Sequence, residues 1–146
     1  MSNKPLIDSL KVVLADSYAL YLKTQNYHWN VEGPHFKAIH ELLEDHYTDL
    51  AEAIDDIAEI IRALGAKAPG TWQAYEALTS IVGGDENADA KTMLDHLAKD
   101  HELILKSLFS GVKEAQKVED EVVVGALAER MTIHRKNLWM LKSMLK

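Results

Sequence analysis

Apolar residues recur every three to four positions over most of the chain, and this spacing predicts long amphipathic helices. Four such stretches cover residues 5–31, 34–64, 88–116 and 120–145. Gly33 and Pro34 separate the first two, because glycine and proline are unfavourable inside helices. Gly65 follows the second stretch and suits a C-terminal cap. The longest connection joins the second and third stretches, and residues 71–78 within it predict a short helix.

Four long helices with mostly short connections indicate an all-α fold. The expected architecture is a ferritin-like antiparallel four-helix bundle, with a short extra helix in the crossover between helices two and three. The 146 residues, of which 47% are hydrophobic, are enough for one domain with its own core. We therefore expect residues 1–146 to form a single domain.

Composition and charge exclude several classes of function. The formal net charge of −7 argues against a main role in binding nucleic acid or an anionic membrane. The chain has no cysteine, which excludes thiolate chemistry and disulfides. No apolar stretch reaches membrane-spanning length, and the N-terminus lacks the apolar region of a secretory signal. The expected location is the cytoplasm.

Polar residues with metal-binding side chains form a stripe on the second predicted helix. His40, Glu44, Asp55 and Glu59 follow one another at spacings of 4, 11 and 4 residues, which places them within roughly 100° of arc. At 1.5 Å per residue, His40 and Asp55 lie about 22 Å apart along the axis. Because ligand bonds are only about 2 Å long, one metal cannot bind both ends of the stripe in one chain.

A two-fold copy of the same helix brings the two ends of the stripe together. The turn at Gly33 and Pro34 also places His28 beside His40, since the two histidines lie six residues before and six residues after Pro34. An isologous interface then creates two equivalent sites. Mixed nitrogen and carboxylate ligands suit iron or manganese, and also zinc. The predicted metal site takes His28, His40 and Glu44 from one chain and Asp55 and Glu59 from its partner.

Other interpretations compete with this site. Single histidines commonly occupy surface or core positions, and carboxylates four residues apart commonly belong to a solvated face. A di-iron site inside one bundle needs Glu-x-x-His pairs on two helices, and only Glu32 and His35 have that spacing, across the Gly-Pro break. His35 and His46 are surface histidines or auxiliary metal sites. Three histidines on later helices lack a matching set of ligands: His96, His101 and His134.

Several segments resemble one family. These are "NYHWNVEGPHF", "IHELLEDHY", "IDDIAEIIRALG" and "KNLWMLKSML", and together they resemble the Dps family, the mini-ferritins named as DNA-binding proteins from starved cells. The resemblance covers nearly the whole chain, and all five ligand positions match the family's spacing. It implies a homododecameric cage whose di-iron ferroxidase centres lie at two-fold interfaces. Such cages oxidise Fe(II), preferably with hydrogen peroxide, and store Fe(III) mineral, which limits oxidative damage by Fenton chemistry.

The resemblance also implies roles for individual residues. The two histidines of the site are neutral nitrogen ligands, and the three acids are hard oxygen ligands. The family uses Asp or Glu at the position of Glu44, and Asp55 is placed to bridge two irons. Trp29 matches a tryptophan that takes up oxidising equivalents in the family, and the alternative for it is packing against the dimer partner. Zinc or manganese are possible substitutes for iron.

Further acidic residues have less specific expectations. Acids near the site could orient its imidazoles, and the candidates are Glu41, Asp45 and Asp56. A second acidic group could line an iron pore at a three-fold axis of the cage, or simply favour the start of a helix through the helix dipole. This group consists of Glu119, Asp120, Glu121 and Glu129.

The family name raises the question of DNA binding. Members that bind DNA directly often use a long lysine-rich tail, because an acidic cage repels phosphate. The N-terminal stretch here carries only Lys4 and Lys11, and the C-terminal one only Lys142 and Lys146. We therefore expect weak DNA binding or none. The alternative function is a nucleoid-associated protein that compacts DNA and has a minor or vestigial metal site.

Overall fold

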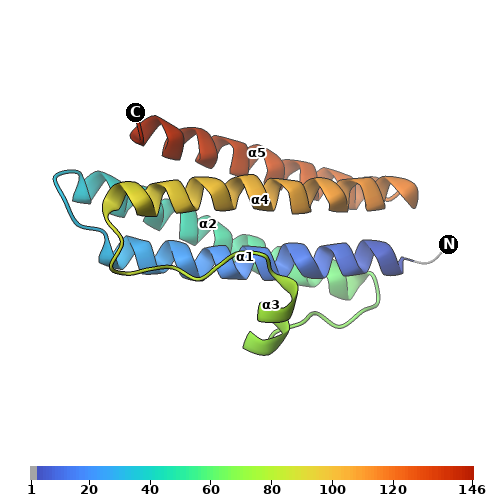
Figure 1. Cartoon of the computed structure of the whole chain (residues 1–146). Helices are drawn as coiled ribbons and strands as arrows, with labels where there is room; N and C mark the ends of the chain where they lie inside the picture. Colours follow the sequence, from blue (N-terminus) through green and yellow to red (C-terminus); the bar gives the residue numbers. More distant parts are fainter. Residues whose placement is uncertain (1–2) are drawn as a thin grey trace.

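The computed structural model describes residues 3–146, which form five helices and no strand (Figure 1). Every helix boundary lies within two residues of the prediction. The helices are α1 (Lys4–Asn30), α2 (Phe36–Ala63), α3 (Trp72–Leu78), α4 (Ala90–Lys117) and α5 (Glu121–Met144).

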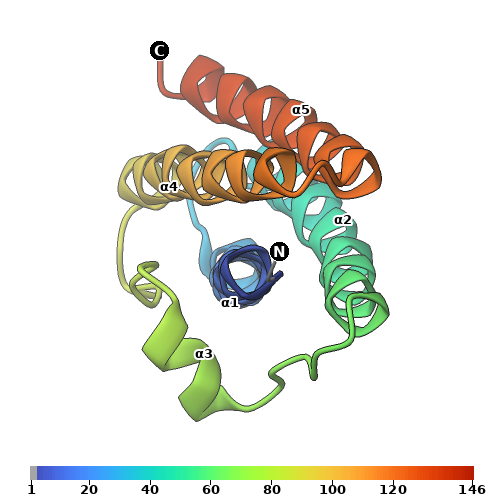
Figure 2. The same ribbon diagram turned by 90° about the vertical axis from the view of Figure 1, so that its right-hand side faces the viewer.

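The four long helices pack side by side as two antiparallel pairs. Helices α1 and α2 form one pair and α4 and α5 the other, and short turns join the members of each pair (Figures 1 and 2). The connection from α2 to α4 travels back along the length of the bundle beside α1 and contains α3 (Figure 1). This single long crossover is the topology of ferritin-like bundles. The predicted fold class and the extra helix are confirmed.

Local sequence explains where the helices begin and end. Gly33 and Gly65 adopt φ angles of 129° and 97°, a region that costs glycine little because it has no Cβ. Gly33 thereby turns the chain between α1 and α2, and Gly65 follows the end of α2. Three helices begin with a side-chain cap on a backbone N–H: Thr71 accepts from Ala74, Asp89 from Thr92, and Asp120 from Val123.

Leucine, isoleucine and valine fill the space between the four long helices. On α2 the buried residues Leu43, Leu50 and Ile57 recur every seven positions and face the other helices. Burying such side chains is the main favourable contribution to folding, about 2 kcal/mol for each. Among the described residues, no helix is both long and apolar enough to cross a membrane.

Asp16 fastens the crossover to the bundle. Its side chain is completely buried on α1 and accepts hydrogen bonds from Thr79 Oγ1 at 2.6 Å, Ser107 Oγ at 2.6 Å and the Ser80 backbone N–H at 3.3 Å. A carboxylate buried in this way is stable only because several donors replace its water. Asp16 therefore links α1, α4 and the segment that follows α3.

Two more residues of α1 hold the same crossover further along. Lys23 is buried, forms an ion pair with Asp100 of α4 at 2.8 Å, and donates to the carbonyl of Val82 at 2.7 Å. The hydroxyl of Tyr27 accepts a hydrogen bond from the backbone N–H of Asp85 at 3.1 Å. The polar groups of α1 thus fix the crossover, while its apolar face packs into the core.

Three histidines meet inside the bundle, which the sequence interpretation did not foresee. His46 of α2, His101 of α4 and His134 of α5 are all buried, so the expectation that His46 lies on the surface is wrong. His101 and His134, for which no matching set of metal ligands was identified, contact each other, and their Nδ1 atoms lie 3.0 Å apart. The guanidinium of Arg130 donates to His134 Nε2 at 3.0 Å and also pairs with Asp49. Both ring nitrogens of His46 are buried without a partner.

The surroundings of this cluster favour neutral imidazoles. Burial lowers the pKa of His46 to about 4 and that of His101 to about 3. Burial and the neighbouring His101 and Arg130 hold the pKa of His134 well below its usual value. Because a guanidinium only donates, His134 must accept at Nε2 and carry its proton on Nδ1, which donates to His101. The pair is therefore a hydrogen bond between two neutral rings.

Candidate metal centre

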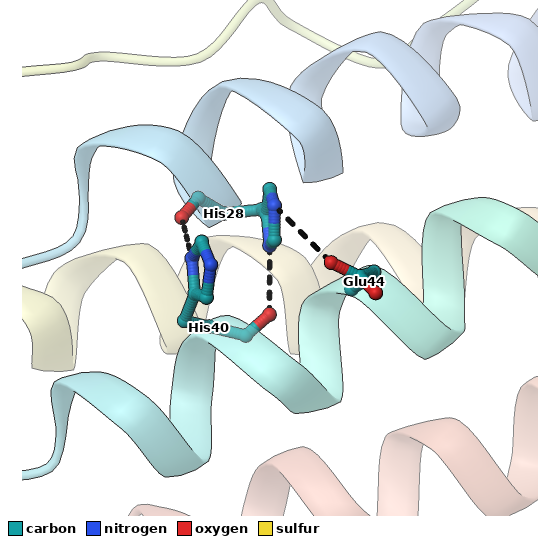
Figure 3. Close-up of side chains that lie close together, drawn as sticks. All are labelled: His28, His40 and Glu44. Atoms are coloured by element: carbon teal, nitrogen blue, oxygen red, sulfur yellow. Dashed lines mark hydrogen bonds and ion pairs between the residues drawn. The ribbon is translucent and has the colours of Figure 1, made fainter.

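His28 of α1 and His40 of α2 lie face to face where the two helices meet near the Gly33 turn (Figure 3). Their ring centroids are 3.8 Å apart and the rings are almost parallel, with an angle of 11°. His28 Nδ1 contacts the backbone carbonyl of His40 at 2.7 Å, and His40 Nδ1 contacts the carbonyl of His28 at 2.7 Å. The expectation that the turn brings these two histidines together is confirmed.

These reciprocal contacts determine the tautomer of both rings. A backbone carbonyl can only accept a hydrogen bond, so each Nδ1 must carry a hydrogen and donate it. Each neutral imidazole then has its lone pair on Nε2. A hydrogen bond from the other ring nitrogen to a carbonyl is how proteins commonly orient a metal-binding histidine. Both histidines therefore present Nε2 as a ligand atom before any metal arrives.

The end of α1 contributes to this arrangement. The last carbonyls of a helix have no partner within it, and His28 lies in the final turn of α1. The imidazole of His40 supplies the missing donor. The same contact thus completes the end of α1 and orients a candidate ligand on α2.

Glu44 adds a carboxylate one turn after His40 on the same helix. Its Oε1 lies 3.8 Å from His28 Nε2, and one ligand atom from each of the three residues lies within 4.8 Å of the others. Two ligands of one metal, each bonded at about 2.1 Å, lie at most about 4.2 Å apart. The imidazole of His28 is buried, whereas the Glu44 side chain is 58% exposed and free to adjust. We name His28, His40 and Glu44 the imidazole half.

A second acidic group lies further along α2. Asp55, Asp56 and Glu59 are all exposed, and one carboxylate oxygen from each lies within 4.8 Å of the others. A hydrogen bond to Asp55 and the charge of Asp55 raise the pKa of Glu59. We name these three residues the carboxylate half. Asp56 was expected only as an orienting acid, and the structure places it among the candidate ligands.

The two halves lie at opposite ends of one helix. Residues 40 and 55 are separated by about 22 Å of helix axis, so the described chain does not combine them. The imidazole half supplies two histidines and one carboxylate and the carboxylate half supplies three carboxylates, so neither half alone holds all five residues of the predicted site. Completion of each site by a second copy of the chain therefore stays a prediction.

The remaining candidates near the imidazole half have other surroundings. Trp29 is 61% exposed, although its neighbour His28 is buried. Glu41 Oε1 lies 3.8 Å from Lys37 Nζ. The nearby acids were candidates for orienting the imidazoles, and within the described chain backbone carbonyls accept hydrogen bonds from both Nδ1 atoms. The sequence could not reveal this, because every residue carries a carbonyl.

The model of the ferritin-like domain matches residues 7–146. The chain is 37% identical over 143 residues to "DNA protection during starvation protein 2" of Bacillus anthracis, a match that covers 98% of both sequences. The chain belongs to the Dps family. General stress protein 20U of Bacillus subtilis is a further relative, 32% identical over 98% of this chain and 99% of that protein.

Solved structures agree with this assignment to the Dps family. A Dps protein from Bacillus brevis superposes with a TM-score of 0.96 at 28% identity and covers 100% of both chains. Dps from Vibrio cholerae O1, described as a member of a superfamily of ferritin-like di-iron carboxylate proteins, gives a TM-score of 0.94 at 27% identity. That match covers 99% of this chain and 91% of the other.

The donor atoms of this Dps-family chain fit iron. Neutral imidazole nitrogens and carboxylate oxygens are ligands that iron accepts, and no soft thiolate is present to favour other metals. The locked tautomers leave Nε2 of both histidines free for coordination. The exposed acids of the carboxylate half supply hard oxygen ligands, which suit both Fe(II) and Fe(III).

Proposed function

We propose that this protein is a ferroxidase and iron-storage cage. It oxidises Fe(II), preferably with hydrogen peroxide, and stores the Fe(III) mineral inside a dodecamer built from two-fold dimers. Its effect in the cell is protection against oxidative damage, since the reaction removes both Fe(II) and peroxide. The observation that carries this proposal is the pair of interlocked imidazoles, His28 and His40, which both hold Nε2 ready for a metal beside Glu44.

The separation of the two halves supports a site shared between chains. In a two-fold dimer, the imidazole half of one chain faces the carboxylate half of the other, and two equivalent sites result. Asp55 is the proposed bridge between two irons, and Glu59 completes the oxygen ligands. Two Fe(II) ions supply the two electrons that reduce one peroxide, with two protons, to two molecules of water. Trp29 is proposed to take up an oxidising equivalent when only one Fe(II) is bound.

The acidic group at the start of α5 has a proposed role in the cage. The side chain of Asp120 caps α5, which accounts for one member as part of a helix end. Glu121 and Glu129 are exposed on the same helix. We propose that they line a pore at a three-fold axis through which Fe(II) enters.

The double variant His28→Ala/His40→Ala tests the ferroxidase site. Without either nitrogen ligand, we expect the fast phase of Fe(II) oxidation by peroxide to slow by more than about 100-fold. Stopped-flow absorbance of the Fe(III) product measures this phase. His35→Ala is the matched control, because His35 is exposed just before α2 and belongs to neither half. Oxidation at the wild-type rate in the double variant would show that the site lies elsewhere.

The second candidate function is DNA compaction, and several relatives are named as DNA protection during starvation proteins. The formal net charge of −7 opposes it, because association with DNA depends largely on basic groups that neutralise phosphates. We expect no stable complex with duplex DNA at low micromolar protein, neutral pH and physiological salt. A gel-shift experiment tests this, and a tight complex would instead favour a nucleoid-associated function.

A further inference from the structure

Two aromatic side chains extend the histidine pair into a column of four rings. The phenyl ring of Phe36 stacks on His40 with centroids 4.8 Å apart and an angle of 25°. Tyr47 meets His28 in a T-shaped contact, with centroids 5.1 Å apart and an angle of 66°. The ring contacts follow the order Phe36, His40, His28 and Tyr47, so each imidazole contacts the other imidazole and one aromatic ring.

The spacing along α2 produces this column. Phe36 lies four residues before His40, and Tyr47 lies seven residues after it, so all three project from one side of the helix. Tyr47 is itself supported by Tyr21 of α1, whose ring meets it edge-on at 6.0 Å and 70°. Neither Phe36 nor Tyr47 belongs to the imidazole half or the carboxylate half.

The column restrains the tilt of the imidazole rings, which the hydrogen bonds do not. A single bond from Nδ1 fixes one atom of each imidazole but leaves the ring free to tilt about that atom. A tilt moves Nε2, which lies on the opposite side of the ring, away from the position that a metal requires. Phe36 stacked on His40 and Tyr47 in T-shaped contact with His28 oppose this movement, and aromatic pairs of both kinds are attractive beyond the apolar surface that they bury.

We propose that Phe36 and Tyr47 are positioning residues for the imidazole half. They set the tilt of His40 and His28 and thereby the affinity of the site for a first-row divalent cation. This inference rests on the proposed ferroxidase function, since it concerns the same site. It adds two side chains that bind no metal themselves but control how well the histidines do.

Co(II) binding to the iron-free assembled protein tests the inference. Co(II) accepts the same ligands, and its visible absorption reports the coordination of the bound ion. We expect Phe36→Leu and Tyr47→Leu each to weaken binding by about tenfold, as measured by calorimetry, and to alter the Co(II) spectrum. Tyr47→Phe keeps the ring and should bind as wild type does.

Phe109→Leu is the matched control. Phe109 is an exposed phenylalanine of α4 that stacks against Lys113 and lies outside the column. It should leave both the affinity and the spectrum unchanged, and thermal unfolding of each variant shows whether a loss reflects global instability. Phe36 lies at the first position of α2 and is 41% exposed, so Phe36→Leu can decide the question even if Tyr47→Leu does not fold.

Each result supports or contradicts one of the two proposals. Wild-type affinity and spectrum in Phe36→Leu would overturn the inference, as would an equal loss in Tyr47→Phe, which would instead make the hydroxyl important. If His28→Ala/His40→Ala binds Co(II) as wild type does, the proposed ferroxidase site itself fails. If that double variant loses binding while the ring variants keep it, the ferroxidase proposal stands and only the positioning role is wrong.

Discussion

A one-to-one mixture of two inactive variants is expected to recover about one quarter of the wild-type rate of Fe(II) oxidation. The first variant, His28→Ala/His40→Ala, lacks the imidazole half, and the second, Asp55→Asn/Glu59→Gln, lacks the carboxylate half. Neither forms a complete site alone. In a mixed dimer, the intact carboxylate half of the first variant meets the intact imidazole half of the second, which restores one of the two sites.

The size of the recovery follows from random pairing. Half of the dimers are mixed and each contains one complete site out of two, which gives about one quarter of all sites. The experiment requires refolding the two variants together or producing them together, followed by stopped-flow measurement. A mixture no faster than its separate components would contradict a site shared between chains. A chain that carries all four substitutions serves as the control. It lacks both halves, so it should stay inactive after the same refolding.

Acid is expected to destabilise the protein through the histidine cluster in the core. The pKa values of His46, His101 and His134 in the folded protein lie below the ordinary value of 6.5. Between pH 6.5 and those lower values, the unfolded chain binds more protons than the folded one, so stability falls as the pH falls. Each histidine contributes about 1.4 kcal/mol per pH unit in this range. For His46, whose folded pKa is about 4, the total reaches about 3 kcal/mol at pH 4.

His46→Leu isolates this effect. Because neither ring nitrogen of His46 has a partner, the substitution removes no hydrogen bond and eliminates one titrating group. We expect a smaller decrease in the thermal unfolding midpoint between pH 7 and pH 4.5 than in the wild type, at one protein concentration. His35→Leu, at an exposed histidine, should follow the wild-type profile. An unchanged profile in His46→Leu would show that His46 does not titrate in this range.

The helices were predictable because strong local signals mark their ends. Gly33 and Gly65 occupy conformations that favour glycine, and Thr71, Asp89 and Asp120 cap the helices that follow them. These signals act over a few residues and can therefore be recognised in the sequence alone. The path of the crossover along α1 was not predictable in the same way. It depends on contacts such as those of Asp16 with Thr79 and Ser107, which are distant in sequence.

The candidate site was likewise predictable only in part from the sequence. The stripe on α2 and the Gly33 turn were sufficient to place His28 beside His40 and Glu44. The carbonyl bonds and the aromatic column were not foreseen, because backbone groups and packed rings leave no distinctive spacing. The cluster of His46, His101 and His134 was missed because each is a single polar residue on a mainly apolar helix face. Only the packing of α2, α4 and α5 brings them together.

The distance between the two halves on α2 also makes the proposed chemistry depend on assembly. A newly synthesised chain carries both halves but no complete site, so it should be inert toward iron until it meets a second copy. The oxidation rate should then rise with the square of the chain concentration when the protein is dilute enough to dissociate. Fe(II) would be oxidised only by protein that has already begun to assemble into the cage that stores the Fe(III) mineral.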